Sequence, residues 1–157
     1  MRIGHGTDVH AFTSGRPLVL GGVTIEHTHG LAGHSDADAL IHAICDALLG
    51  ALGLPDIGHW FPPGDPAYAD IASTRLLERV MEMLRAAGWR VVNVDTTILA
   101  QAPKLAPHLP AMRRVLAPLL GVSDDCVGIK ATTAESLGYV GRGEGIEVHA
   151  VCLLTRD

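Results

Sequence analysis

Apolar positions along the chain follow two periods, one of two residues and one of three to four, which predict strands and helices respectively. The shorter period and the β-branched composition predict strands at residues 1–11, 89–99, 126–132 and 145–155, and a hairpin over 18–25 that turns at Gly21-Gly22. The longer period predicts helices at 36–52, 70–87 and 108–120, and Pro118 is expected to distort or shorten the last of them. Residues 55–68 are rich in Pro, Gly and Asp, which indicates a loop or lid.

The order of these elements predicts an α+β fold: a single domain, residues 1–157, with a mixed β-sheet and helices packed on one face of the sheet. The last strand places Ile146 and every second residue after it on one apolar face. Its other face carries Glu147 and His149, but also the apolar Val151. No element remains to cover this second face, so we expect it to be buried in a homo-oligomer.

Composition and charge narrow the range of partners. The formal net charge is -5 and no basic block is present, so no nucleic-acid partner is expected. An acidic chain that handles phosphate must rely on metal ions, helix N-termini and backbone N–H groups. The cysteines Cys45, Cys126 and Cys152 are scattered, which favours a reducing compartment over a disulfide framework. No apolar run has the length of a membrane span and no targeting segment is recognisable, so we expect a cytoplasmic protein without a membrane partner.

Three residues in the first half of the chain have the chemistry of a metal site. Asp8 and His10 are two residues apart, so an extended strand points both side chains to one face. His42, from the predicted helix, completes a three-ligand set that suits zinc or a similar divalent ion, and Asp46, one turn later, is expected to orient its imidazole. For Asp8 and His10 alone, a turn cap and a partly exposed histidine are the alternative. The other histidines without such a carboxylate are expected to be surface or structural residues: His5, His27, His29, His59 and His108.

Two further segments suit phosphate. His34 and Ser35 stand at the start of the predicted helix, where free backbone N–H groups favour an anion, although Ser35 as a simple helix cap is the alternative. Thr132, Thr133 and Glu135 follow a predicted strand and could hold phosphate oxygens and a second divalent ion. The alternative there is a threonine cap with Glu135 as its capping-box partner.

Two loops could contact a ligand or a neighbouring subunit. Residues 100–105 follow a strand and could enclose a nucleotide base with their backbone, with Lys104 meeting a phosphate, although an ordinary connection is the alternative. Residues 138–145 are rich in glycine, but no helical pattern follows them, so they are not a dinucleotide-binding motif. Arg142 in this segment could bind an anion or a neighbouring subunit.

Four segments, taken together, closely resemble the 2-C-methyl-D-erythritol 2,4-cyclodiphosphate synthase family. They are RIGHGTDVHAF, GLAGHSDADALIHAICDALLGALGLPDIGHWFPPGDP, NVDTTILAQAPK and KATTAESLGYVGRGEGI, and they follow the family's order over nearly the whole chain. Two departures are the wording HSDADA, where Gly-Asp-Val is commoner in the family, and an extra proline in the loop.

The resemblance implies an enzyme, a phosphorus-oxygen lyase of non-mevalonate isoprenoid precursor biosynthesis. It would convert 4-diphosphocytidyl-2-C-methyl-D-erythritol 2-phosphate to 2-C-methyl-D-erythritol 2,4-cyclodiphosphate plus CMP by metal-assisted intramolecular phosphoryl transfer. The family is a homotrimer with active sites between subunits, which agrees with the uncovered sheet face.

The resemblance also assigns residues. The zinc ligands match Asp8, His10 and His42, and the magnesium or manganese ion that bridges the diphosphate matches Glu135. The catalytic positions that steady the pentavalent phosphorus match His34 and Thr133. Asp8, His10, His34, Thr133 and Glu135 count among the substrate contacts, and the others match Ser35, Asp56, Ile57, Gly58, Phe61, Pro62, Pro63, Gly64, Asp65, Ala100, Gln101, Ala102, Pro103, Lys104, Leu105, Ala106, Ala131, Thr132, Tyr139 and Arg142. Of these, 61–65 match a flexible loop, and 100–106 with 131–133 match a cytidine pocket formed by the neighbouring subunit.

Tyr139 and Arg142 match positions near a central cavity that has been suggested to bind isoprenoid diphosphates. Tyr139 stands where an apolar ring is frequent, and with Glu147 and His149 it argues against carrying that ligand over to this chain. Two other functions stay open on the residues alone: a metal-dependent phosphoesterase, and a non-enzymatic trimeric module that binds nucleotides or isoprenoid phosphates.

Overall fold

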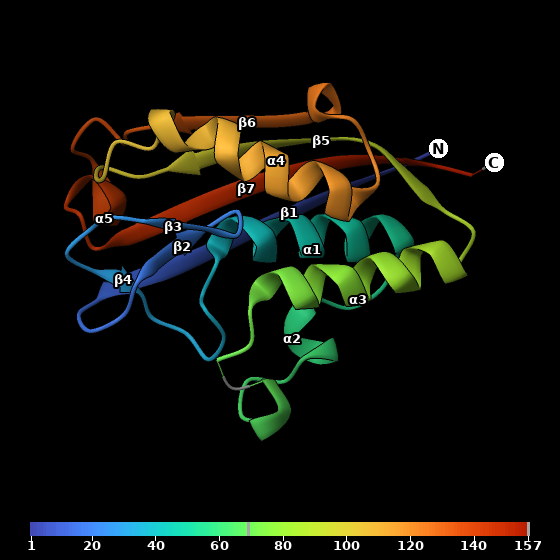
Figure 1. Cartoon of the computed structure of the whole chain (residues 1–157), viewed down its shortest axis with the longest axis horizontal. Coiled ribbons are helices and arrows are strands. Elements are labelled where there is room, and N and C mark those ends of the chain that lie inside the picture. Colours follow the sequence, from blue (N-terminus) through green and yellow to red (C-terminus); the bar gives the residue numbers. More distant parts are fainter. Residues whose placement is uncertain (69, 157) are drawn as a thin grey trace.

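The computed structural model describes residues 1–68 and 70–156, so Ala69 and Asp157 of the predicted domain 1–157 lie outside the described residues. A five-stranded sheet with the order β4-β1-β7-β5-β6 forms the centre of the fold, and a two-stranded hairpin lies beside it (Figure 1). The strands are β1 (Arg2–Thr13), β2 (Leu18–Leu20), β3 (Val23–Ile25), β4 (Gly30–Leu31), β5 (Arg90–Leu99), β6 (Val127–Thr132) and β7 (Gly145–Thr155). Only β5 and β6 pair in parallel, so the sheet is mixed, as the sequence predicts.

Helices α1 (Ala39–Leu52) and α4 (Leu109–Leu120) pack on one face of this sheet (Figure 1). The other helices are α2 (Ile57–Trp60), α3 (Ser73–Ala86) and α5 (Gly138–Gly141), and the 3-10 turns are η1 (Pro66–Tyr68), η2 (Ala106–His108) and η3 (Asp124–Cys126). Helix α1 packs against β1 and β7, and α3 packs on α1 from the side away from the sheet (Figure 1). The predicted α+β class, with helices on one face, is therefore confirmed. None of the described helices is long and apolar enough to cross a membrane.

Two glycines of β1 allow α1 to lie directly on the sheet. A Cβ atom at Gly4 would stand 1.9 Å from the carbonyl oxygen of Ala47, and one at Gly6 would stand 2.2 Å from that of Ala43. Both distances are far shorter than a van der Waals contact, so only glycine fits at these positions. This contact fixes the distance between α1 and the strand that carries Asp8 and His10.

The first helix begins later than predicted. It starts at Ala39, and its N-cap is Asp38, whose side chain accepts a hydrogen bond from the Ile41 backbone N–H. The same carboxylate accepts hydrogen bonds from the backbone N–H groups of Gly21 (2.9 Å) and Gly22 (2.7 Å), so it joins the hairpin turn to the helix start. The prediction that residues 36–38 are helical and that Ser35 caps the helix was wrong, because a buried carboxylate with three backbone donors is the stronger cap.

Two other expectations need correction. Helix α4 continues through Pro118 to Leu120 and ends at Gly121 in the left-handed conformation. A proline this close to the end removes only one helical hydrogen bond, so it does not shorten the helix. The segment expected to be a loop, 55–68, contains the short helix α2 and the turn η1, and the glycine-rich segment contains α5. One-turn helices leave too few residues to show a period in the sequence.

The face of the sheet opposite the helices is open in the single chain. Along β1 the exposed residues include Ile3 (72% exposed) and Val9 (51%), and along β7 they include Val151 (38%). Polar residues share this face: the rings of His5 and His149 stack with their centroids 5.9 Å apart. The alternation predicted for β7 is confirmed, since Ile146, Val148, Ala150, Cys152 and Leu154 are all buried.

Candidate metal and phosphate site

Asp8, His10 and His42 meet where β1 passes the first turn of α1. Nε2 of His10 lies 2.8 Å from Oδ2 of Asp8, and Nδ1 of His42 lies 3.2 Å from the same oxygen. The two ring nitrogens are 3.3 Å apart. Among residues 1–68 and 70–156, these three are the one group of His, Cys, Asp or Glu side chains that could hold a metal ion.

The hydrogen bonds on the far sides of both rings show which nitrogens are free to bind a cation. Nδ1 of His10 lies 2.5 Å from the carbonyl oxygen of Ala32, which can only accept, so Nδ1 carries a hydrogen. Nε2 of His42 faces the hydroxyl groups of Ser73 (2.9 Å) and Ser35 (3.2 Å). Nε2 of neutral His10 therefore carries a lone pair, and it faces Asp8 and Nδ1 of His42.

These donors fit a divalent cation. Oδ2 of Asp8 is buried and has no hydrogen-bond donor among the described residues, although the two ring nitrogens surround it. An oxygen and two nitrogens with no hydrogen between them repel one another unless a cation or a proton lies between them. One carboxylate and two imidazoles with an open side form the donor set of a zinc-type site.

The electrostatics of the metal-free site point the same way. Burial raises the pKa of Asp8, but the close imidazole rings of His10 and His42 and their positive charge when protonated outweigh this and bring the pKa down from 3.8 to about 2. Burial lowers the pKa of His10, but the hydrogen bond and charge of Asp8 outweigh it and the pKa is raised. Without a metal, Asp8 thus favours a proton on Nε2 of His10, on the side where a cation would bind.

The residue that supports His42 is not the one expected. Asp46 accepts a hydrogen bond from the Ile57 backbone N–H at 2.7 Å, and the structure records none between Asp46 and His42. Burial raises the pKa of Asp46 against this hydrogen bond. Ser73 and Ser35 take the predicted role instead. Ser73 gave no signal in the sequence because it reaches the site from the first turn of α3, 31 residues away in the chain.

His34 and Ser35, two of the residues expected to hold phosphate, line one cavity beside this cluster together with the expected loop residues 61–65. The cavity has a volume of about 240 Å³ and is lined by His10, Gly33, His34, Ser35, His42, Ile57, Gly58, Phe61, Pro62, Pro63, Gly64, Asp65, Tyr68, Ile71 and Leu76. His34 and Ser35 reach it from a loop, since α1 begins later and Asp38 already caps its N-terminus. Arg16, which the sequence analysis missed, donates hydrogen bonds to the carbonyl groups of Gly33 and Ser35 and so holds this loop.

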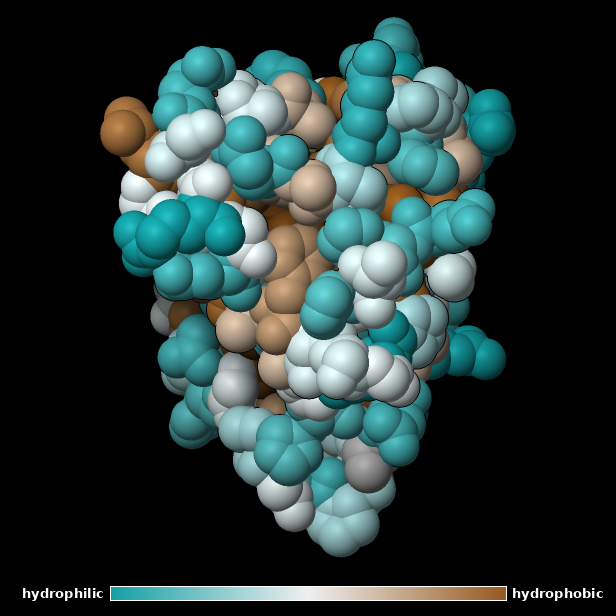
Figure 2. Space-filling view, turned by 90° about the vertical axis from the view of Figure 1, so that its left-hand side faces the viewer, coloured by the Kyte–Doolittle hydropathy of each residue, from teal (hydrophilic) through white to brown (hydrophobic). Residues whose placement is uncertain are grey.

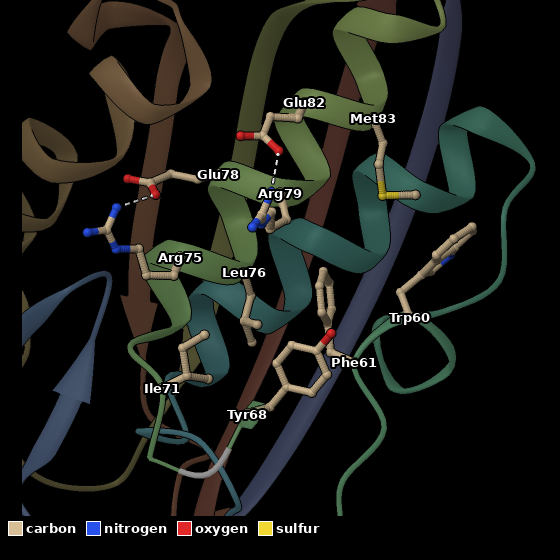
Figure 3. A pocket seen from close by; sticks show the side chains of 10 residues that line it. All are labelled: Trp60, Phe61, Tyr68, Ile71, Arg75, Leu76, Glu78, Arg79, Glu82 and Met83. Atoms are coloured by element: carbon tan, nitrogen blue, oxygen red, sulfur yellow. Dashed lines mark hydrogen bonds and ion pairs between the residues drawn. The ribbon is translucent and has the colours of Figure 1, made fainter. Parts of the chain in front are cut away.

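A second, larger cavity of about 760 Å³ lies on the outer side of the same loop (Figure 3). Phe61 and Tyr68 line both cavities and pack edge to face, with ring centroids 5.4 Å apart. Figure 3 shows their rings between Leu76 of α3 and Trp60 of α2. Two ion pairs of α3, Arg75 with Glu78 and Arg79 with Glu82, form the opposite wall. The aromatic pair, together with Ile71 and Leu76, thus lies between the two cavities.

The segment expected to bind a base lines a separate cavity of about 310 Å³. Its walls are Ala100, Gln101, Ala102, Pro103, Lys104, Leu105, Ala106, Ala131, Thr132 and Thr133, which are the residues that the family resemblance assigns to cytidine. The loop is built between the ends of two parallel strands, since β5 and β6 pair up to Leu99 and Thr132. No residue lines both this cavity and the one beside the metal ligands.

The end of the molecule that carries α5 and β4 has an apolar area at its middle, surrounded by hydrophilic side chains (Figure 2).

Glu135 follows this cavity in a tight turn. Thr133 Oγ1 donates to Glu135 Oε1 at 3.2 Å, and the Glu135 backbone N–H donates to Thr133 Oγ1 at 3.4 Å. Glu135 and Ser136 have positive φ angles of 50° and 64°, which non-glycine residues rarely adopt. The Ser136 N–H donates to the side chain of Gln101 at 3.4 Å, which ties the turn to the neighbouring loop. The capping-box alternative was wrong, because no helix starts at Thr133.

Three expected site residues lie elsewhere in the single chain. Asp56 caps α2 through the backbone N–H of His59 and lines a different hollow with His5, Thr7 and Asp46. Tyr139 donates to Glu147 at 2.5 Å on the open face of the sheet. Arg142 pairs with Glu144 at 2.7 Å, so its ion partner within the chain is a neighbour in sequence.

Comparison with known proteins places this geometry in a family. The YgbB family model matches residues 1–155. A curated relative from Thioalkalivibrio sulfidiphilus, named 2-C-methyl-D-erythritol 2,4-cyclodiphosphate synthase, is 60% identical over 154 residues, covering 98% of this chain and 96% of the relative. A relative of the same name from Moorella thermoacetica is 58% identical over 154 residues, covering 98% of this chain and 94% of the relative.

Solved structures agree with the sequence matches. A 2C-methyl-D-erythritol-2,4-cyclodiphosphate synthase in a CDP-bound form matches with a TM-score of 0.90 at 37% identity, covering 98% of this chain and 100% of that chain. The bifunctional IspDF of Campylobacter jejuni matches with a TM-score of 0.95 at 40% identity, covering 99% of this chain but 42% of that one. The fold, the Asp-His-His cluster and matches over nearly the whole length all agree: this chain belongs to the YgbB family.

Proposed function

We propose that this chain converts 4-diphosphocytidyl-2-C-methyl-D-erythritol 2-phosphate to 2-C-methyl-D-erythritol 2,4-cyclodiphosphate and CMP. An oxygen of the 2-phosphate attacks the β-phosphorus of the CDP group, a new P–O bond closes the ring, and the bond from the β-phosphorus to the bridging oxygen breaks. CMP leaves with that oxygen, so the reaction consumes no water and needs no protein nucleophile. The reaction class is that of a phosphorus-oxygen lyase.

The observation that carries the proposal is the cavity beside the Asp8, His10 and His42 cluster, which His10 and His42 line together with Ile57, Gly58 and residues 61–65. The family resemblance assigns this ligand set to zinc, Gly58 to the methylerythritol and residues 61–65 to the adjoining flexible loop. His34 and Ser35 line the same cavity, where they would position the phosphates. The chemistry of such a reaction is mainly positioning and charge neutralisation, because the nucleophile and the leaving group belong to one molecule.

We assign a zinc-type ion to Asp8, His10 and His42 and a magnesium or manganese ion to Glu135. Bound cations would neutralise phosphate oxygens that otherwise repel one another. This explains how a chain with a formal net charge of -5 accepts a strongly anionic substrate. His34 and Thr133 are the proposed groups that steady the phosphorus during transfer.

We further propose that the active unit is a homotrimer with its sites between subunits. The support is the separation of the two cavities within one chain, since the substrate must contact both ends. The exposed Ile3, Val9 and Val151 on the open sheet face are the surface that such an assembly would cover. Residues 1–157 would form one domain of it, and the reduced cysteines Cys45, Cys126 and Cys152 fit the proposed cytoplasmic location.

The test is product analysis with the purified chain, the substrate and magnesium. One CMP released per substrate, without inorganic phosphate, is the expected result. Inorganic phosphate or a linear diphosphate would instead identify a phosphoesterase. Binding of substrate by metal-replete protein without turnover would identify a binding module.

A further inference from the structure

We propose that Asp36 and Ser73 form a relay that fixes the tautomer of His42 and so prepares its Nδ1 to bind the cation. The relay runs from a carboxylate through a hydroxyl to the imidazole. It rests on the proposed metal centre at Asp8, His10 and His42, and it deepens that proposal by naming the residues that support one ligand.

The direction of the hydrogen bonds follows from the number of hydrogens available. Asp36 Oδ2 accepts from the Ser73 backbone N–H at 3.0 Å, and Oδ1 accepts from the Asp38 N–H at 3.3 Å and from the Ser73 hydroxyl. Ser73 has a single hydroxyl hydrogen, and Asp36 takes it. The Ser73 oxygen, 2.9 Å from Nε2 of His42, can then only accept, so Nε2 carries a hydrogen and Nδ1 does not.

Burial excludes water from this hydrogen-bond arrangement. Ser73 is completely buried, so no solvent water offers its hydroxyl another acceptor. Nδ1 of His42 faces Oδ2 of Asp8 at 3.2 Å, which is the side where the cation belongs. A hydrogen on Nδ1 would block that side, so the relay selects the one neutral form of His42 that can act as a ligand.

Ser35 does not replace this relay. Its hydroxyl oxygen lies 3.2 Å from Nε2 of His42 and accepts from the Ala37 N–H at 3.1 Å. Among the described residues, the recorded side-chain contacts of this hydroxyl are with His42 and with Ser73, the latter at 3.4 Å, and neither fixes the direction of its hydrogen. Ser35 can therefore donate or accept toward His42, whereas Ser73 can only accept.

The relay also joins separate parts of the chain. Ser73 is the first residue of α3, and residue 72 at the N-cap is an alanine without a capping side chain. Asp36 supplies the missing acceptor from another loop, through the Ser73 N–H. Ser73→Ala keeps this backbone hydrogen bond and removes only the hydroxyl, so it separates the relay from the capping of α3.

The experiment measures zinc affinity of the whole chain by competition with a chromophoric chelator at fixed pH. Ser73→Ala and Asp36→Ala are each expected to weaken zinc binding about 10- to 100-fold, the usual effect of removing a partner of a ligating histidine. Asp36→Ala acts without touching His42, because it frees the Ser73 hydroxyl to donate to Nε2 and so favours the wrong tautomer. The double variant should lose little more than Ser73→Ala alone.

Conservative and distant variants serve as controls. Ser73→Thr and Asp36→Asn keep the hydroxyl and an acceptor oxygen, so their zinc affinity should stay close to that of the parent chain. Ser123→Ala removes a similar serine–aspartate hydrogen bond, to Asp125, away from the site and should change nothing.

Nitrogen NMR of the histidines in the metal-free protein reads the tautomer directly. The parent chain should show His42 with its hydrogen on Nε2, and Ser73→Ala and Asp36→Ala should show it redistributed to Nδ1. Unchanged tautomer and zinc affinity in both variants, or losses that simply add in the double variant, would overturn the relay. A parent chain that binds no zinc would contradict the metal centre instead, and the tautomer measurement would still decide the relay.

Discussion

The Nδ1 atom of His10 lies 2.5 Å from the carbonyl oxygen of Ala32. The carbonyl belongs to the segment that continues β4, and the histidine belongs to the adjacent strand β1. This hydrogen bond directs the opposite nitrogen of the ring toward Asp8 and His42. Backbone pairing at the edge of the sheet thus sets the orientation of a metal ligand before any metal binds.

Removal of a metal ligand should abolish both metal content and turnover. His42→Ala leaves one carboxylate and one imidazole, too few to hold a zinc-type ion firmly. We expect metal analysis of the purified variant to show loss of the ion and the product assay to show nearly complete loss of activity. His29→Ala, an exposed histidine on the loop before β4, is the matched control and should retain both. Full activity of His42→Ala in metal-analysed protein would refute the assignment.

The metal-free protein should lose stability in acid through Asp8. Burial raises its pKa, but the adjacent His10 and His42 imidazoles outweigh this, and the folded-state pKa is about 2 instead of 3.8. A lowered folded-state pKa stabilises the fold above the unfolded pKa, and the gain is lost as pH falls through the folded one. We therefore expect about 2 kcal/mol of unfolding free energy to disappear between pH of about 4 and about 2. Denaturant titrations of the chelator-treated chain and of Asp8→Asn should differ in this window, and parallel pH curves would count against the ion pair.

Close packing of β1 on α1 predicts opposite effects for two glycine substitutions. Gly6→Ala would place a Cβ atom 2.2 Å from the Ala43 carbonyl oxygen, so helix and strand must separate. We expect a loss of several kcal/mol or failure to fold. Gly50→Ala, within α1, meets only the His5 carbonyl oxygen at 3.8 Å and should stabilise the chain by up to about 1 kcal/mol. Thermal unfolding of both variants checks this, and equal stability would show that the helix does not lie so close.

Active sites shared between subunits should be restored by mixing two inactive variants. His42→Ala damages the cavity of the metal ligands, and Thr133→Ala damages the cavity of residues 100–106. After the two are unfolded together and refolded, random assembly should place intact halves together in roughly a quarter of the sites. The product assay should therefore recover activity that neither variant shows alone. No recovery in mixed oligomers, verified by mass spectrometry, would mean that each chain holds a complete site.

The sequence predicted the long elements because each has enough residues to show its period. The alternating residues of β7 and the apolar stripe of α3 lie where expected, and Asp8, His10 and His42 do meet. Strand geometry places Asp8 and His10 on one face of β1, and His42 reaches them from the first turn of α1. These contacts depend on local geometry and on one strand–helix packing contact.

The supporting residues could not be predicted, because they depend on contacts between distant segments. Asp46 has the right spacing to support His42, yet the Ile57 backbone N–H takes its carboxylate. Ser73 reaches His42 from α3, and Arg16 reaches the His34 loop from the turn after β1. Asp38 is similar, since the hairpin turn at Gly21 and Gly22 makes it a better cap than Ser35. Tertiary contacts decided each of these positions.

Phosphorus NMR of the product tests the central claim most directly. The purified chain would be incubated with 4-diphosphocytidyl-2-C-methyl-D-erythritol 2-phosphate and magnesium, and the spectrum followed until the substrate is consumed. We expect two mutually coupled diphosphate resonances of a cyclic product and a stoichiometric CMP signal. A signal of inorganic phosphate, a linear diphosphate, or unchanged substrate with metal-replete protein would contradict this expectation.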